Sequence, residues 1–284
     1  MEQTVRTVDV AEITNALKEL CVTANHYLSP DMKNALETAE KTEAAPLGKK
    51  ILRQLEENLQ IAGEDMIPIC QDTGMAVVFL QIGQDVHFVG GDLTEAVNEG
   101  VRRGYVDGFL RKSVVKDPLI RENTKDNTPA VLHTEIVPGD KVKITIAPKG
   151  FGSENMSKIY MLKPADGIEG VKAAVMNAVE AAGPNACPPM VVGVGIGGTF
   201  EKCALLAKKA LLRPADDASP VAYVRDLEKE LLDKINATGI GPGGLGGTTT
   251  AMAVKIETYP THIAGLPVAV NICCHVNRHC SAEI

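Results

Sequence analysis

Apolar residues near the start of the chain recur every three or four positions, which is the spacing of one face of an α-helix. Three successive stretches follow this period: Val10, Ile13, Leu17 and Leu20, then Met32, Leu36 and Ala39, then Ile51, Leu52, Leu55 and Leu59. We therefore expect residues 1–62 to form a mainly helical portion of the fold.

Beyond this portion, short apolar runs alternate with amphipathic stretches. The runs MAVVFLQIG (75–83) and MVVGVGIGG (190–198) are bounded by glycine or proline and predict buried strands. Residues 92–110 predict a helix with Asp92 as its N-cap, and residues 131–148 predict a β-hairpin with PGD as the turn. The remaining pattern predicts helices over 168–182, 199–214 and 222–236, and closing strands over 248–259 and 265–274.

Helices and strands in this order predict a mixed α/β fold. No repeat, low-complexity segment or long linker divides the chain. We therefore expect a single domain over residues 1–284, with mixed β-sheets flanked by helices and the helical portion included in it.

Charge and hydropathy narrow the classes of function. The chain has 29 Lys and Arg against 36 Asp and Glu, a net charge of −7, and its basic residues are dispersed, which argues against nucleic-acid binding. An acidic substrate therefore needs a local group of arginines or helix N-termini. The N-terminus lacks the pattern of a signal peptide, and no apolar run reaches the roughly 18 residues of a membrane span. These features predict a cytoplasmic protein.

The seven cysteines are expected to be reduced thiols or metal ligands, because their number is odd and no export signal is evident. Cys21 and Cys203 lie in apolar helical stretches, which is typical of core thiols. Cys70, Cys187 and the closing run NICCHVNRHC (271–280) instead lie at element ends beside Pro, Gly and polar residues. Three thiolates from distant segments suggest zinc, copper(I) or iron–sulfur chemistry, and three unrelated cysteines are the alternative.

A glycine motif in the second predicted strand has a rival interpretation. Gly193, Gly195 and Gly198 match the dinucleotide-binding fingerprint. That fingerprint also needs an acidic residue at the end of a following strand, whereas Asp216 and Asp217 lie in a predicted loop. Close packing, or backbone N–H groups near an anion, explains these glycines better.

Four long motifs follow one another along the chain: ICQDTG, KGFGSENMSK, NACPPMVVGVGIGGTFEKCALLAKKALLR and GIGPGGLGGTTT. In this order they closely resemble the iron–sulfur hydro-lyases, namely the class I fumarate hydratases and the related L(+)-tartrate dehydratases. The match covers nearly the whole chain, and the length resembles the alpha subunit of the two-subunit form. KGFGSENMSK is more similar to the fumarate hydratases.

The resemblance implies a set of site residues. Cys70, Cys187 and Cys274 would hold a 4Fe–4S cluster with one iron left for substrate; Cys274 is preferred to Cys273 because the family's ligand directly precedes an aromatic residue or histidine. The remaining implied residues contact substrate: Asp72 as proton donor or orienting acid, His262 in the same pocket, Gln71, Arg111 on a substrate carboxylate, and Gly150 and Gly152 through their backbone N–H groups.

The implied reaction is the reversible anti addition of water to fumarate, which gives L-malate. The threonine base and further basic residues of the family are absent from this chain, so the resemblance implies a beta subunit that completes the site, in an α2β2 assembly. Tartrate dehydration is the alternative within the family. Two other classes remain: an iron–sulfur sensor without catalysis, and a zinc protein that uses His275, His279 and neighbouring cysteines.

Overall fold

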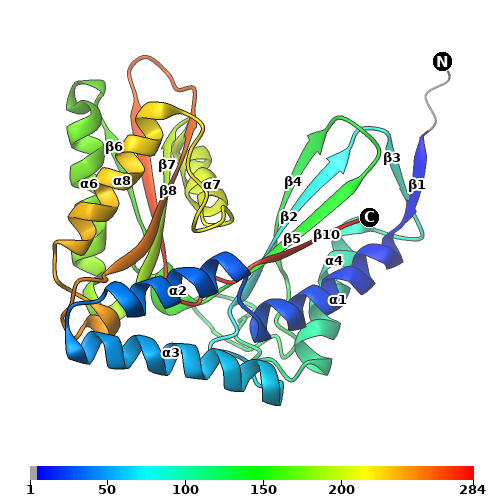
Figure 1. Ribbon diagram of the computed structural model, residues 1–284. Helices are drawn as coiled ribbons and strands as arrows, with labels where there is room; N and C mark the ends of the chain where they lie inside the picture. Colours follow the sequence, from blue (N-terminus) through cyan, green and yellow to red (C-terminus); the bar gives the residue numbers. More distant parts are fainter. Residues whose placement is uncertain (1–4) are drawn as a thin grey trace. The chain divides into compact units, whose positions relative to one another are not determined.

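The computed structural model describes residues 5–284 and divides them into two compact units, each with its own sheet and core (Figure 1). Unit 1 and unit 2 are made of these segments: residues up to Ser29, Leu59–Phe151 and Arg278–Ile284 in unit 1, and Pro30–Asn58 and Gly152–Asn277 in unit 2. The chain thus passes between the units several times, and neither is a continuous segment. This division into units does not test whether residues 1–284 form a single domain, which stays a prediction.

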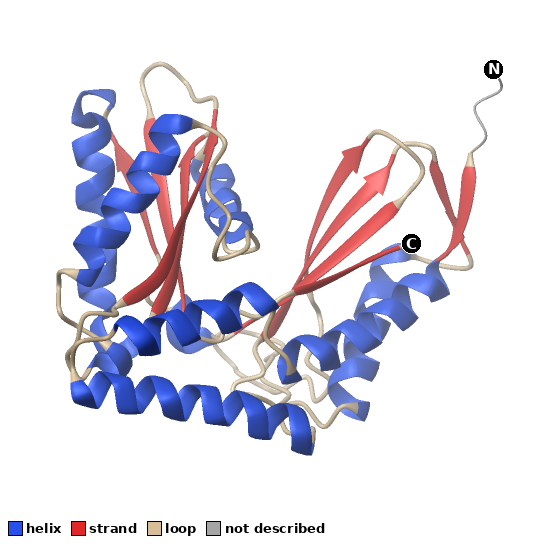
Figure 2. Ribbon diagram, in the orientation of Figure 1, coloured by secondary structure: helices blue, strands red, loops and turns tan. Residues whose placement is uncertain are grey.

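Unit 1 is a four-stranded sheet with helices α1 and α4 packed on it, plus a small parallel sheet of β1 and β3 (Figure 2). The strand order of the larger sheet is β10-β5-β2-β4. Its elements are β1 (Arg6–Asp9), α1 (Val10–His26), β2 (Met75–Gly83), β3 (Val86–Val89), α4 (Leu93–Asp107), β4 (Val131–Val137), β5 (Val142–Lys149) and β10 (Cys280–Glu283).

The helix boundaries of unit 1 follow from side-chain caps. Asp92 accepts a hydrogen bond from the backbone N–H of Glu95 at 2.9 Å and begins α4, as predicted. Asp9 caps α1 in the same way through the N–H of Ala11 at 2.9 Å. The strand predicted over residues 75–83 is confirmed as β2.

The predicted hairpin over residues 131–148 is wrong in its pairing. Its two strands form, but β4 pairs in parallel with one side of β2 and β5 pairs antiparallel with the other side. The PGD turn therefore carries the chain across the end of β2. Alternation of apolar residues specifies which face of a strand is buried and leaves its neighbour unspecified.

Unit 2 is a second four-stranded sheet, of order β6-β9-β7-β8, with helices on both faces (Figure 2). Helices α6 and α8 share its main core, and α7 packs on the opposite face. Its elements are α2 (Pro30–Thr42), α5 (Phe151–Glu154, which begins in unit 1), β6 (Lys158–Leu162), α6 (Gly167–Ala182), β7 (Met190–Gly197), α7 (Phe200–Ala210), α8 (Ala222–Asn236), β8 (Ala251–Tyr259) and β9 (Leu266–Cys273); α3 (Pro46–Asp65) contributes residues to both units.

The glycines of β7 serve close packing of a helix. A Cβ atom on Gly193 would lie 2.2 Å from the carbonyl oxygen of Ala207, and one on Gly195 would lie 2.0 Å from that of Cys203. Both carbonyls belong to α7, so its backbone lies directly against the glycine face of the strand. This accounts for the GVGIGG motif without a dinucleotide.

The two large sheets share one arrangement. In each, a central strand (β2 or β7) has a parallel neighbour (β4 or β8) and an antiparallel neighbour (β5 or β9). In each, a short strand (β10 or β6) pairs antiparallel with the outer side of that antiparallel neighbour. The structure therefore contains a topological repeat that no residue pattern in the sequence indicates.

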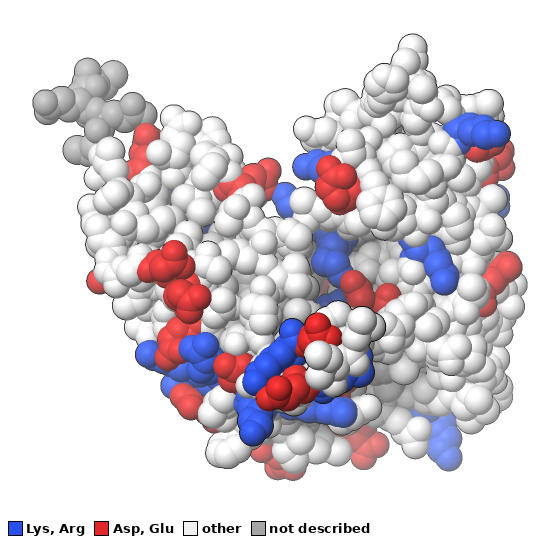
Figure 3. All heavy atoms as spheres, turned by 180° about the vertical axis from the view of Figure 1, so that it is seen from behind, with Lys and Arg blue, Asp and Glu red and all other residues white. Residues whose placement is uncertain are grey.

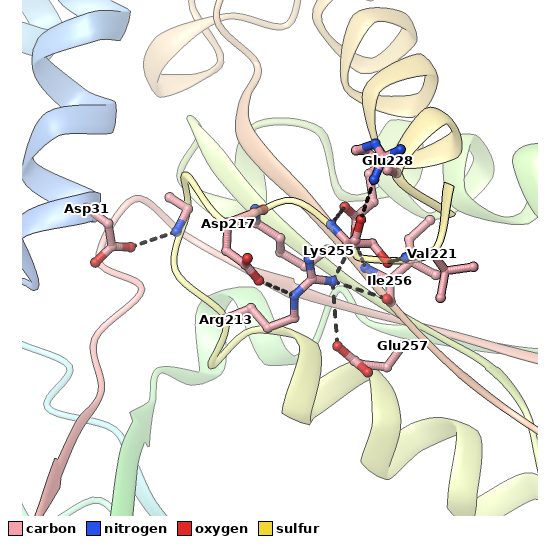
Figure 4. Close-up of polar contacts among 11 residues, drawn as sticks. Asp31, Arg213, Asp217, Val221, Glu228, Lys255, Ile256 and Glu257 are labelled. Carbon is pink, nitrogen blue, oxygen red and sulfur yellow. Dashed lines mark hydrogen bonds and ion pairs between the residues drawn. The ribbon is translucent and has the colours of Figure 1, made fainter. Parts of the chain in front are cut away.

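A cluster of charged groups connects the segment that follows α7, which contains Arg213 and Asp217, to β8 (Figure 4). Arg213 contacts Asp217 at 3.0 Å and Glu228 at 2.7 Å, and Glu228 also accepts the backbone N–H of Ile256 at 2.8 Å. Lys255 donates to the carbonyl of Asp217, and burial lowers the pKa of its ammonium group. Each charge has partners of opposite sign or backbone groups, which is the arrangement of a structural ion cluster.

The surface carries no segregated charge on the face seen in Figure 3, where basic side chains lie beside acidic ones. Among residues 5–284, none of the helices is both long and apolar enough to cross a membrane.

Candidate active site

The residues of ICQDTG and KGF meet at one end of the sheet in unit 1. Cys70 and Asp72 come just before β2, and Gly150 comes just after β5. Met75, the first residue of β2, pairs with Lys149, the last residue of β5, in an antiparallel register. Segments far apart in the sequence are therefore neighbours here.

Asp72 is held by backbone donors from both of these segments. Its Oδ1 accepts the N–H of Gly74 at 3.0 Å, and its Oδ2 accepts the N–H of Phe151 at 2.9 Å. A Cβ atom on Gly150 would lie 3.2 Å from Oδ2, which is tighter than ordinary contact. Gly150 thus allows the end of β5 to approach the carboxylate.

Arg111 is attached to the same segment through its main chain. The Thr73 hydroxyl donates to the carbonyl of Arg111 at 3.1 Å and accepts its N–H at 2.9 Å. Thr73 is buried, whereas the side chain of Arg111 is exposed. The guanidinium forms no hydrogen bond or ion pair with any described residue. Its backbone is therefore fixed while its charged end stays available to an anion.

The sulfur of Cys70 is half-buried and lies among polar groups. It accepts the N–H of Asp72 at 3.4 Å and donates to Gln71 Oε1 at 3.2 Å. Gln71 itself is exposed.

In unit 2, Cys187 and Cys274 lie at one end of the second sheet. Cys187 precedes β7 and Cys274 follows β9, and the antiparallel pairing of Val191 with Cys273 brings these strand ends together. The contact of His275 Nδ1 with the carbonyl oxygen of Cys187 at 3.1 Å agrees with this register.

Cys187 has a left-handed backbone conformation, with φ 52° and ψ 62°. This region is uncommon for residues other than glycine, and such strain is concentrated at functional sites. The turn is held by the glycine-rich loop of residues 239–250: Gly243 donates to the carbonyl of Pro188 at 2.8 Å. The loop therefore supports the turn that presents Cys187.

Glu43 organises this glycine-rich loop and was missed in the sequence analysis. The side chain is 1% exposed and accepts backbone N–H groups of Ala45, Thr248 and Thr249 at 2.8 Å each. Burial alone would raise the pKa of Glu43, but these donors outweigh it and lower the pKa below the usual value. Glu43 begins the short connection between α2 and α3, where no local sequence signal marks it.

The other cysteines have the character of core thiols, and none of the seven forms a disulfide. Burial raises the pKa of Cys280 to about 12, and it also raises the pKa values of Cys21 and Cys203. Cys273 is 5% exposed. A raised pKa makes Cys21, Cys203 and Cys280 poor metal ligands.

The structure does not bring every expected residue together. His262 lies in the loop between β8 and β9, whereas Cys187 and Cys274 lie at the opposite end of the same sheet. The length of strand β9 separates them, so we leave His262 out of the proposed site. Gly152 belongs to unit 2, and a Cβ atom there would meet nothing nearer than the carbonyl oxygen of Asn185 at 4.0 Å.

No group of three His, Cys, Asp or Glu side chains within residues 5–284 is assembled to hold a metal ion. Of the expected cluster ligands, Cys187 and Cys274 belong to unit 2 and Cys70 belongs to unit 1.

Comparison with known proteins identifies the class of this site. The family model described as fumarate hydratase (Fumerase) matches residues 14–283. The chain belongs to this family, whose members are hydro-lyases, and the expected enzyme class is thereby confirmed.

Individual relatives carry the name of a related activity. A putative L(+)-tartrate dehydratase subunit alpha of Methanocaldococcus jannaschii is 43% identical over 279 residues, which cover 96% of this chain and 98% of that protein. The L(+)-tartrate dehydratase subunit alpha of Escherichia coli strain K12 is 30% identical over 272 residues, which cover 95% of this chain and 89% of that protein. The protein of the same name from Shigella sonnei has the same identity and coverage.

Proposed function

We propose that the chain is the alpha subunit of a two-subunit hydro-lyase that reversibly hydrates fumarate to L-malate. The observation that carries this proposal is the position of Arg111. Its exposed guanidinium forms no bond to any described residue, and its main chain is tied to Thr73, next to Asp72. A planar guanidinium held in this way suits bidentate binding of a substrate carboxylate.

We propose Cys70, Cys187 and Cys274 as ligands of a 4Fe–4S cluster. These residues fit the group, because none is fully buried, whereas burial keeps Cys21, Cys203 and Cys280 protonated. The N–H of Asp72 also donates to the sulfur of Cys70. When bound, the cluster would supply a Lewis-acidic iron for a substrate carboxylate and hydroxyl.

The residues around Cys70 have separate roles in the proposal. Arg111 binds one carboxylate, and Gln71 donates from its exposed amide to the substrate. Asp72 has a second lone pair on each carboxylate oxygen beyond those used by Gly74 and Phe151. It can therefore orient a water molecule or hold a proton at the substrate hydroxyl, while Gly150 lets the backbone approach.

The base that handles the carbon-bound proton is expected on a beta subunit. The names of the relatives, which call them subunit alpha, support a partner chain. An α2β2 assembly and a cytoplasmic location belong to the same proposal.

L(+)-tartrate is the second candidate substrate, and the printed names of the relatives favour it. L-malate and L(+)-tartrate, the two hydroxy-diacids that would be dehydrated, differ by one hydroxyl group. An added hydroxyl changes discrimination by only about 1–3 kcal/mol in an apolar pocket, so both substrates belong in the assay.

The test is anaerobic purification of the chain with and without its co-expressed partner. Iron, sulfide and zinc are measured, and fumarate or L(+)-tartrate turnover is followed. We expect iron and sulfide, with activity only in the complex, and Arg111→Met should raise KM for the diacid at least about tenfold. Zinc without sulfide would contradict the cluster, and a cluster with no turnover of any diacid in the complex would favour the sensor.

A further inference from the structure

Arg278 is a buried arginine that contacts the main chain on both sides of the candidate site in unit 1. Its side chain is 4% exposed. Nη2 donates to the carbonyl of Asp72, and Nε donates to the carbonyl of Pro148 at 3.2 Å. Asp72 precedes β2 and Pro148 lies at the end of β5, so one guanidinium fastens the two segments that carry the site.

The charge of Arg278 has no acidic partner among residues 5–284. Its hydrogen bonds go to carbonyl oxygens, and the buried Nη1 atom has no partner there. A buried donor without an acceptor costs about 1–3 kcal/mol, and buried cations are normally paired. This arrangement is poor for stability alone, and such groups call for a functional explanation.

Arg213 provides a contrast in the pairing of its charge, although its Nη2 atom is likewise buried without a partner among residues 5–284. It is also largely buried, but its guanidinium lies between the carboxylates of Asp217 and Glu228 (Figure 4). The charge of Arg213 is therefore balanced inside unit 2. The guanidinium of Arg278 forms hydrogen bonds only to the carbonyl oxygens of Asp72 and Pro148 within residues 5–284.

Gly150 places the guanidinium next to the substrate-binding groups. A Cβ atom on Gly150 would lie 3.2 Å from Asp72 Oδ2 and 4.0 Å from Arg278 Nη2. The carboxylate and the guanidinium thus border the same glycine. Movement of Arg278 would shift the main chain of Asp72 and, through Thr73, that of Arg111.

We propose that Arg278 is a positioning residue for binding and turnover of the dicarboxylate. It holds the main chain of Asp72 against the end of β5, so that Asp72 and Arg111 face the substrate in one fixed arrangement. The proposal rests on the proposed function, and it adds a residue that lies within the closing cysteine run and that the four family motifs quoted above do not contain.

The first test measures turnover of the complex with its partner subunit. Arg278→Lys keeps the charge, but one ammonium cannot reproduce the fork that reaches both carbonyls. We expect kcat to fall about 100-fold, with KM changed less than about threefold and iron and sulfide content unchanged. Arg213→Lys is the matched control: it should lower the urea midpoint while kcat per cluster stays within about twofold.

A kcat for Arg278→Lys within about threefold of the wild type would overturn the proposal. The proposal would also be overturned if the activity of Arg278→Lys fell only in proportion to its content of cluster or of folded protein. That is the pattern expected of Arg213→Lys.

The second test does not depend on activity. Hydrogen exchange is measured by mass spectrometry on peptides covering residues 70–75 and 148–152 in Arg278→Gln and Arg213→Lys. We expect faster exchange of both peptides in Arg278→Gln only, because the amides of Gly74 and Phe151 depend on the position of Asp72. Unchanged exchange would overturn the positioning role. Inactivity of the wild type on every diacid would instead contradict the proposed function and leave this readout valid.

Discussion

Single residues in unit 1 show how closely the site is packed. Gly74 has φ +77°, and a Cβ atom there would lie 2.7 Å from the backbone nitrogen of Lys149. Gly139, in the turn before β5, has φ +103° but nothing within 4 Å of its Cβ position. Both glycines need an unusual backbone conformation, and the first also needs the absence of a side chain.

Replacement of these two glycines separates the two requirements. Gly139→Ala should cost about 1–2 kcal/mol of unfolding free energy, which is the conformational penalty alone. Gly74→Ala should cost a further 1–3 kcal/mol or so, because the methyl group forces β5 away from the ICQDTG segment. Urea unfolding of both variants measures the difference, and equal losses would show that β5 adjusts without strain.

The cysteines should differ in reactivity as their burial differs. We expect iodoacetamide at mildly alkaline pH to modify Cys187 in the cluster-free chain at least about tenfold faster than Cys280, whose pKa is raised to about 12 by burial. Peptide mass spectrometry measures both rates. Fast modification of Cys280 in the folded chain would contradict its role as a core thiol, and Cys280→Ser should accordingly retain iron, whereas Cys274→Ser should lose it.

Among single residues, the sequence identified those with reactive or substrate-binding side chains better than those that hold the site in place. Cys70, Asp72 and Arg111 could be singled out by residue type and motif, and the structure brings them together in unit 1. Arg278 and Glu43 could not, because their importance depends on contacts with residues far along the chain. Long-range partners leave no periodic trace in the sequence.

Among the elements, the glycine-rich loop of residues 239–250 shows how a buried carboxylate can replace regular structure. The loop forms only short-range backbone hydrogen bonds of its own, such as that from the N–H of Gly246 to the carbonyl of Ile240, and Glu43 accepts the N–H groups of Thr248 and Thr249. The sequence predicted the long helices and buried strands well. It missed the strands β1, β3, β6 and β10, which are too short to carry a period, and it mispaired β4 with β5.

Glu43 should make this element sensitive to acid. Its folded-state pKa is lowered relative to the unfolded chain, so its stabilisation is present above the unfolded value of about 4.3 and is lost as pH falls through the folded value. Glu43→Gln should cost about 2 kcal/mol at neutral pH and progressively less below about pH 4.

Glu40→Gln is the control for this experiment. Glu40 pairs with the exposed Arg53 at 2.8 Å, and such surface pairs contribute about 0–1 kcal/mol. Urea unfolding from pH 3 to 7 or so compares the variants. A loss in Glu43→Gln that does not depend on pH would contradict the proposed contribution of the charge.

For the whole molecule, the proposed cluster takes its ligands from segments that are far apart in the sequence. Cys70 precedes β2, Cys187 precedes β7, and Cys274 follows β9. Ligation should therefore slow hydrogen exchange of residues 70–75 and residues 187–190 together, and Cys70→Ser should remove the protection of both. Cys280→Ser is the control. Protection of residues 187–190 that survives in Cys70→Ser would show that Cys70 is not a ligand.

The strand arrangement of unit 1 also sets the order in which the chain can mature. β10 pairs with β5 after the chain has passed through the whole of Gly152–Asn277. A nascent chain can complete the sheet of unit 2 while the edge of β5 still awaits its last strand. Because Arg278 arrives with that strand, Asp72 and Arg111 reach their working arrangement only after residues 278–283 are synthesised. A chain interrupted before this point would hold Cys70, Cys187 and Cys274 and still lack an ordered substrate site.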